Sequence, residues 1–106
     1  MPYETIIGHP LTPVAEGSIT VGATATGIPA AQLDLAKGGE IEVHLGVETD
    51  QVRISYLAGG DPANNGILYD VGDKLRIAGP TQCRSMTLIR VTADATVKYL
   101  VQGKAI

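Results

Sequence analysis

Apolar and polar residues alternate in several short segments of this chain, and this period of two limits the fold more than any other feature. In the cleanest run, residues 40–47, every second residue is a branched aliphatic: Ile41, Val43, Leu45 and Val47. Successive side chains of a β-strand point to opposite faces, so such a run predicts a strand with one buried face.

A second informative stretch spans residues 53–77. Ile54 and Tyr56 alternate with polar neighbours at its start, and Leu75 and Ile77 do so at its end. Between them, residues 59–66 are rich in Gly, Asp, Asn and Pro, which favour turns. The pattern predicts two strands positioned by a turn-rich connection.

Further alternating segments lie at residues 18–26, 86–91 and 97–101. Only residues 48–51 separate the run at 40–47 from the one at 52–56, so we expect these two strands to pair as an antiparallel hairpin. Residues 30–36 have helical propensity but are short and flanked by Pro29 and Gly38, which favours a loop or a single 3₁₀ turn.

The composition agrees with an all-β domain. The chain has 106 residues, which is enough for one domain, and its 13 Gly and 6 Pro are spread along it. Short strands at intervals of roughly 8 to 15 residues, without a convincing helix, predict an antiparallel β-sandwich or jelly roll of about seven to eight strands. We assign residues 17–106 to this domain.

Residues 1–16 form a predicted extended amino-terminal arm. Proline at positions 2, 10 and 13 removes main-chain donors and argues against a core strand. The arm is nevertheless rich in apolar side chains, so it either docks on a neighbouring chain, packs on its own domain or stays disordered. If it docks, the candidate contacts with a partner are Tyr3, Ile6, Ile7, Leu11 and Val14.

Charge is distributed unevenly along the chain, whose formal net charge is −3. Residues 1–52 carry a net charge of −6, and residues 53–106 carry +3. The halves either form separate acidic and basic faces or interleave into one mixed surface. The bases are not clustered with aromatic residues, so we expect no nucleic-acid binding. No stretch approaches the roughly 18 apolar residues of a membrane span, and we expect no membrane insertion.

The residues that carry chemistry are sparse. The two histidines, His9 and His44, lie far from any nucleophile motif, and His44 is expected on the solvent face of its strand. One cysteine, Cys83, can form no internal disulfide, and we expect a small buried residue at a strand start. The acidic and amide side chains of residues 61–73 lack the ligand order of an EF-hand calcium loop. We therefore interpret them as turn formers and not as a calcium site. We therefore expect no catalytic residue, metal or cofactor.

Several segments, in this order, resemble small structural proteins of tailed-bacteriophage virions. Those proteins share an Ala-Thr-x-Leu-Pro entry, a Val-x-Ile strand, an Asn-Gly segment, a Gly-Asp/Glu-x-Leu strand and a closing Val-x-Tyr-Leu strand. The matching segments here, between Ser18 and Val101, are residues 20–30, Val52-Arg53-Ile54, Asn65-Gly66-Ile67-Leu68, residues 72–77, and Val97-Lys98-Tyr99-Leu100-Val101. The amino-terminal arm lies outside this likeness.

The resemblance implies a capsid decoration, or cement, protein. Such a protein is made in the cytoplasm of the host bacterium, binds in many copies to the outside of the head and stabilises contacts between subunits of the major capsid protein. Self-association as a dimer or trimer is expected with this role. Two alternatives stay open: a carbohydrate-binding module of a tail or fibre that uses the loop at residues 59–66 with Tyr56 and Tyr69, or a head-completion or tail component.

Overall fold

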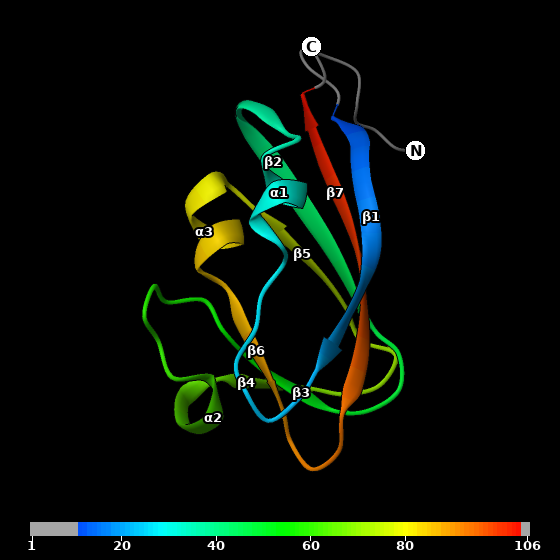
Figure 1. Cartoon of the computed structure of the whole chain (residues 1–106), viewed down its shortest axis with the longest axis vertical. Coiled ribbons are helices and arrows are strands. Elements are labelled where there is room, and N and C mark those ends of the chain that lie inside the picture. Colours follow the sequence, from blue (N-terminus) through cyan, green and yellow to red (C-terminus); the bar gives the residue numbers. More distant parts are fainter. Residues whose placement is uncertain (1–10, 105–106) are drawn as a thin grey trace.

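The computed structural model describes residues 11–104, which form seven strands and three short helices (Figure 1). All strand pairs are antiparallel. The strands are β1 (Thr12–Val21), β2 (Lys37–Val47), β3 (Val52–Ser55), β4 (Ile67–Tyr69), β5 (Lys74–Ala78), β6 (Thr87–Arg90) and β7 (Ala95–Lys104). The helices are α1 (Ala30–Leu33), α2 (Pro62–Asn65) and α3 (Pro80–Ser85). The expected all-β sandwich is confirmed.

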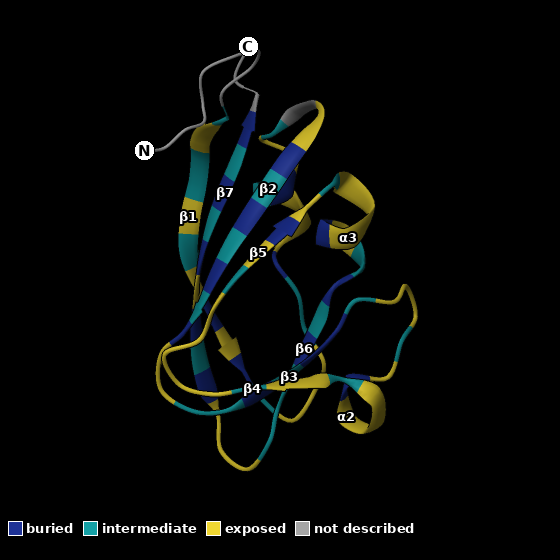
Figure 2. Cartoon of the chain, turned by 180° about the vertical axis from the view of Figure 1, so that it is seen from behind, coloured by how far each residue is buried: buried dark blue, intermediate teal, exposed yellow. Residues whose placement is uncertain are grey.

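The larger sheet has four strands in the order β1-β7-β2-β5. Its inner face carries the aliphatic residues of the alternating runs, and the buried blue and exposed or intermediate bands alternate along β2 in Figure 2. Val43 is paired with Val101 on one side and with Ile77 on the other, so three buried side chains lie in one row across the sheet. Such rows of cross-strand contacts stabilise the sheet and fix its register.

The smaller sheet has three strands in the order β4-β3-β6. Val52, Ile54 and Leu88 on its inner face are fully buried and belong to the same core cluster as Val43 and Val97 of the larger sheet. The core therefore lies between the two sheets and is almost wholly aliphatic, with Tyr99 as its one aromatic member among the buried residues.

The expected hairpin between residues 40–47 and 52–56 is wrong. Both sides of β2 are already occupied, by β7 and β5, so β3 has no edge of β2 to join. The turn at residues 48–51 instead carries the chain to the other sheet. Glu48 N donates to Thr96 O at 2.9 Å, and Thr96 N donates to Thr49 Oγ1 at 2.8 Å, which anchors this turn to β7.

The expected boundary between arm and domain, after residue 16, is also wrong, because β1 already begins at Thr12. Thr12–Glu16 is part of β1 and pairs with the end of β7, with a register shift between Pro13 and Ala15. Proline is tolerated here because β1 is an edge strand with an irregularity at that point. Residues 1–10 lie outside the described part.

Two short helices also differ from expectation. Residues 30–33 form a single α-helical turn in place of a loop or 3₁₀ turn, and Pro80–Ser85 forms α3 where no helix was expected. Cys83 is therefore buried in a helix and not at a strand start. Pro80 occupies the first turn of α3, where its missing N–H has no cost, so a proline after Gly79 is compatible with the start of a helix.

Candidate interaction surfaces

The outer face of the larger sheet carries a cluster of charged side chains. His44 Nε2 lies 2.8 Å from Glu42 Oε1, and Arg76 Nε lies 3.0 Å from Glu42 Oε2. Glu42 is only 17% exposed, whereas Arg76 is 67% exposed. His44 lies on the solvent face, as expected. His44 and Arg76 both contact the carboxylate of Glu42. The cluster ties β2 to β5.

The ion pairs also show how the uneven charge is arranged. Glu42 and Asp34 belong to the acidic half of the sequence, and their partners Arg76 and Arg84 belong to the basic half. The strand order brings these halves together, because β5 and α3 pack beside β2 and α1. The charges at these pairs are interleaved and not segregated.

A shallow hollow of about 300 Å³ lies next to this cluster on the same sheet. Its floor is Gly46, which pairs with Lys74 of β5 on one side and with Lys98 of β7 on the other. A methyl group at Gly46 would meet no atom within 4 Å, so the space is open. Neither lysine has an ion-pair partner among residues 11–104.

A groove of about 410 Å³ runs between β5 and the smaller sheet. Leu75 and Ile77 line it from β5, and Tyr56 and Tyr69 line it from the opposite side. The two tyrosine hydroxyls are 2.9 Å apart. Burial, followed by this hydrogen bond, raises the pKa of Tyr56 far above its usual range. This hydrogen bond links the residue after β3 to β4 along one wall of the groove.

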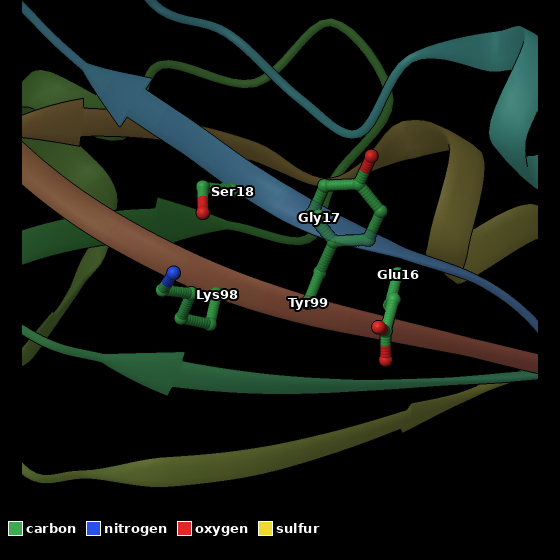
Figure 3. Close-up of a pocket in the computed structure, with 5 residues that line it drawn as sticks. All are labelled: Glu16, Gly17, Ser18, Lys98 and Tyr99. Atoms are coloured by element: carbon green, nitrogen blue, oxygen red, sulfur yellow. The ribbon is translucent and has the colours of Figure 1, made fainter.

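At the opposite edge of the larger sheet, Tyr99 lies across Gly17. A methyl group at Gly17 would come within 2.7 Å of Tyr99 Oη, so only glycine leaves room for the ring. Figure 3 shows the Tyr99 ring beside β1, together with Glu16 and Ser18. These residues line a depression of about 340 Å³. The Tyr99 hydroxyl donates to Gln32 Oε1 at 3.2 Å and so connects β7 to the residues of α1.

The candidate contacts of the amino-terminal arm divide into two groups. Leu11 and Val14 are half-buried, and Val14 packs against the core of its own domain from within β1. Tyr3, Ile6 and Ile7 lie outside the described residues. Val14 thus has a packing role within its own domain, and the expected partner contacts of the arm stay a prediction.

The turn-rich stretch at residues 59–73 uses its polar side chains locally. Asp61 caps α2 by accepting from Asn64 N at 3.4 Å and from Asn64 Nδ2 at 2.7 Å, and the second of these bonds is the main reason that its pKa is lowered. Asp73 Oδ2 accepts from Asp70 N at 2.8 Å in the next turn. Within residues 11–104, no three His, Cys, Asp or Glu side chains are grouped to hold a metal ion.

Aliphatic side chains are exposed on β4 and next to it. Ile67 is 56% exposed and Leu57 is 71% exposed, and both line a hollow of about 410 Å³ beside α2. Leu68 and Val71 are exposed nearby in the sequence. Exposed aliphatic side chains around one hollow, here Leu57 and Ile67, are candidates for contact with another protein.

The outer face of the smaller sheet is covered by the segment that contains α2. Pro62 is buried there, and Gly60 approaches Ser55 so closely that a methyl group would come within 2.2 Å of Ser55 Oγ. The hydroxyl of Thr87, opposite Ser55 in the register, is buried and has no hydrogen-bond partner among the described residues. The turn-rich stretch is therefore a cover for this sheet as well as a connection.

Comparison of the chain with protein-family models, with curated proteins and with solved structures found no match. None of the helices between residues 11 and 104 is long and apolar enough to cross a membrane.

Two of these surfaces were not found by reading the sequence. In the sequence, Tyr56 and Tyr69 are only aromatic residues near a loop. The groove between them and β5 forms because of how the two sheets are arranged, which the sequence does not indicate. The pairing of Glu42 with Arg76 depends on β5 lying beside β2. A partial signal existed in the matched alternation of the two segments, since each carries charge on the face opposite its aliphatic residues.

Proposed function

We propose that this protein is a capsid decoration protein of a tailed bacteriophage, bound in many copies to the outside of the head, where it stabilises contacts between subunits of the major capsid protein. One observation carries the proposal most: a small β-sandwich exposes aliphatic side chains such as Leu57 and Ile67 around a short edge strand. This surface is suited to contacts with another protein. The resemblance of residues 18–101 to small virion proteins points to the same role.

The physical logic of the role is multivalency. A single copy offers only a small apolar surface and a few exposed charged side chains, which support weak binding. Copies that also contact one another bind with an effective concentration set by their neighbours, so the array can be far more stable than one contact. A decoration protein therefore needs a rigid body and interaction edges, and it needs no catalytic centre.

The copy number in purified phage particles tests this role. Quantitative mass spectrometry against the major capsid protein should give on the order of hundreds of copies per particle. A value of about a dozen or fewer would instead support a head-completion or tail component. An absence of the protein from purified particles would contradict every virion role.

A deletion that tests the arm as a contact must leave β1 intact. Removing residues 1–16 would destroy half of β1, whereas removing residues 1–10 keeps every described strand. We expect the shorter deletion to keep the sandwich folded, as measured by circular dichroism, and to weaken binding to particles. Unchanged binding by the folded, shortened chain would exclude the arm as a contact.

A carbohydrate-binding module is the second candidate. It is favoured by the hollow beside α2, which is lined by the aromatic Tyr56 and the polar Asp61 and Asn65. Aromatic and hydrogen-bonding groups in one concave site are typical of small-ligand recognition. A glycan array would reveal a selective ligand if this candidate is correct, and Asn65→Ala should then reduce its binding.

A further inference from the structure

We propose that the free edge of β5 accepts residues 3–7 of a second copy, which add to the larger sheet as a fifth strand and link copies head to tail. This inference rests on the self-association included in the proposed function. Residues 3–7 are the donor segment, and the outer edge of β5 is the acceptor edge. Addition of an extended segment to an exposed sheet edge is a common mode of protein association.

The acceptor edge is the outer side of β5, the outermost described strand of its sheet (Figure 2). Asp73 O accepts from Val47 N at 3.0 Å, and Gly79 N donates to Ile41 O at 2.9 Å, so the odd-numbered residues of this segment face β2. In an antiparallel pair, the intervening residues direct their main-chain groups away from the partner strand. The peptide groups of Lys74, Arg76 and Ala78 therefore point outward, and no strand within residues 11–104 pairs with them.

In contrast to β5, the outer edge of β6 in the smaller sheet makes main-chain hydrogen bonds with the segment that follows β1. Thr26 N donates to Leu88 O at 2.9 Å, and Leu88 N donates to Thr26 O at 2.7 Å. Arg90 N donates to Gly22 O at 3.0 Å. The segment after β1 thus covers β6, whereas no main-chain hydrogen bond from residues 11–104 covers the outer edge of β5 in this way. An uncovered edge is a template for another strand.

The surroundings of β5 define which segment fits. The groove of about 410 Å³ is lined by all five residues of β5 and by the two tyrosines, and Leu75 and Ile77 are the less exposed members of β5. On the outer side, Lys74 and Arg76 project from the sheet and are exposed. A matching strand would therefore place aromatic or apolar side chains inward and at least one acidic side chain outward, because opposite charges on neighbouring strands attract each other.

The amino-terminal sequence has this pattern. Tyr3, Thr5 and Ile7 share one face of an extended strand, and Glu4 and Ile6 share the other. No proline lies between Pro2 and Pro10, so every residue from 3 to 7 keeps its N–H donor. The segment has the same length as β5, which has five residues. These residues lie outside the described part of the structure.

The place where this segment joins the domain favours a second copy as acceptor. It leads into β1, and β1 and β5 are the two opposite edges of the larger sheet. Three strand spacings, about 14 Å, separate these edges. The donor segment of one copy therefore begins at the β1 edge, on the opposite side of the sheet from that copy's own β5, and two copies meet donor to acceptor. Contacts of this heterologous kind can close into rings.

The test uses full-length chains in solution and no phage particle. The donor is blocked in Thr5→Pro/Ile6→Pro, whose control Thr5→Val/Ile6→Val keeps both N–H groups. The acceptor is blocked in Arg76→Pro, whose control Arg76→Val loses the same contact with Glu42 but keeps the edge N–H. Sedimentation velocity over a range of concentrations measures association, and circular dichroism verifies folding.

We expect the wild-type chain and both valine controls to associate, and each proline variant to associate at least about tenfold more weakly, because main-chain hydrogen bonds are lost. A mixture of the two proline variants should form a one-to-one complex, since each keeps the half that the other lacks.

A wild-type chain that stays monomeric at all concentrations would overturn the proposal. Proline variants that associate like their controls, or a mixture that stays monomeric, would overturn it as well. If Arg76→Pro does not fold, Lys74→Pro and its control Lys74→Val take its place, because proline is tolerated at the first residue of an edge strand. Failure of this test leaves the decoration role to be decided by the copy number in particles.

Discussion

Two glycines of the larger sheet should respond in opposite ways to the same substitution. Gly17 of β1 and Gly46 of β2 both lack a positive φ, so alanine can adopt either backbone conformation. The surroundings differ: a methyl group would lie 2.7 Å from Tyr99 Oη at position 17 and would meet nothing within 4 Å at position 46. A difference between the two alanine variants therefore reports the packing around each position and not a backbone strain.

The magnitudes follow from the two environments. Replacing a strand glycine by alanine in open space stabilises a protein by roughly 0.5–1 kcal/mol, which is our expectation for Gly46→Ala. At Gly17, displacing the buried ring costs about 1–3 kcal/mol, as in other overpacked cores, and exceeds this gain. We expect Gly17→Ala to lower the free energy of unfolding by about 1–2 kcal/mol.

Urea denaturation followed by circular dichroism measures the difference. With a slope of about 1–2 kcal/mol per molar for a domain of this size, the midpoints of the two variants should differ by roughly 1–2 M. In a Tyr99→Leu background the penalty at Gly17 should shrink, because the obstructing ring is gone. Equal shifts of both glycine variants in the same direction would refute the packing of Tyr99 on Gly17.

Three further predictions concern single side chains. Thr87→Val should raise the free energy of unfolding by about 1 kcal/mol in urea denaturation, because it removes a buried hydroxyl without a partner, and a loss of stability would show that a water satisfies it. The pKa of Tyr56 is raised in the folded state, so stability is unaffected below a pH of about 10 and falls above it, where only the unfolded chain releases this proton. Absorbance at 295 nm should show one tyrosine that titrates late, and Tyr69→Phe should bring it earlier. Burial raises the pKa of the Cys83 thiol, so Ellman's reagent should react with it only after denaturation, and rapid reaction of the native protein would contradict its burial.

The local pattern predicted the strands well because burial on one face imposes a period of two. The alternating runs at residues 40–47, 74–78 and 97–101 all lie within strands with buried inner faces. The pairing of β2 could not be predicted in the same way. A short connection favours a hairpin, but the contacts of β2 with β7 and β5 involve long separations in sequence and occupy both of its sides.

The start of β1 shows a different limit of sequence reasoning. Pro13 argued for an arm, yet one side of an edge strand needs no main-chain donors, so its cost there is small. The interaction surfaces were less predictable still. The groove beside β5 combines residues from β4, β5 and α3 with Tyr56, which follows β3, and no spacing in the sequence indicates that these would meet.

The most direct test of the decoration role is a cryo-electron microscopy map of phage particles that carry the protein. We predict density for the sandwich in a repeating array over the outside of the head, in contact with neighbouring subunits of the major capsid protein. Density confined to the tail or to the junction between head and tail would contradict this role.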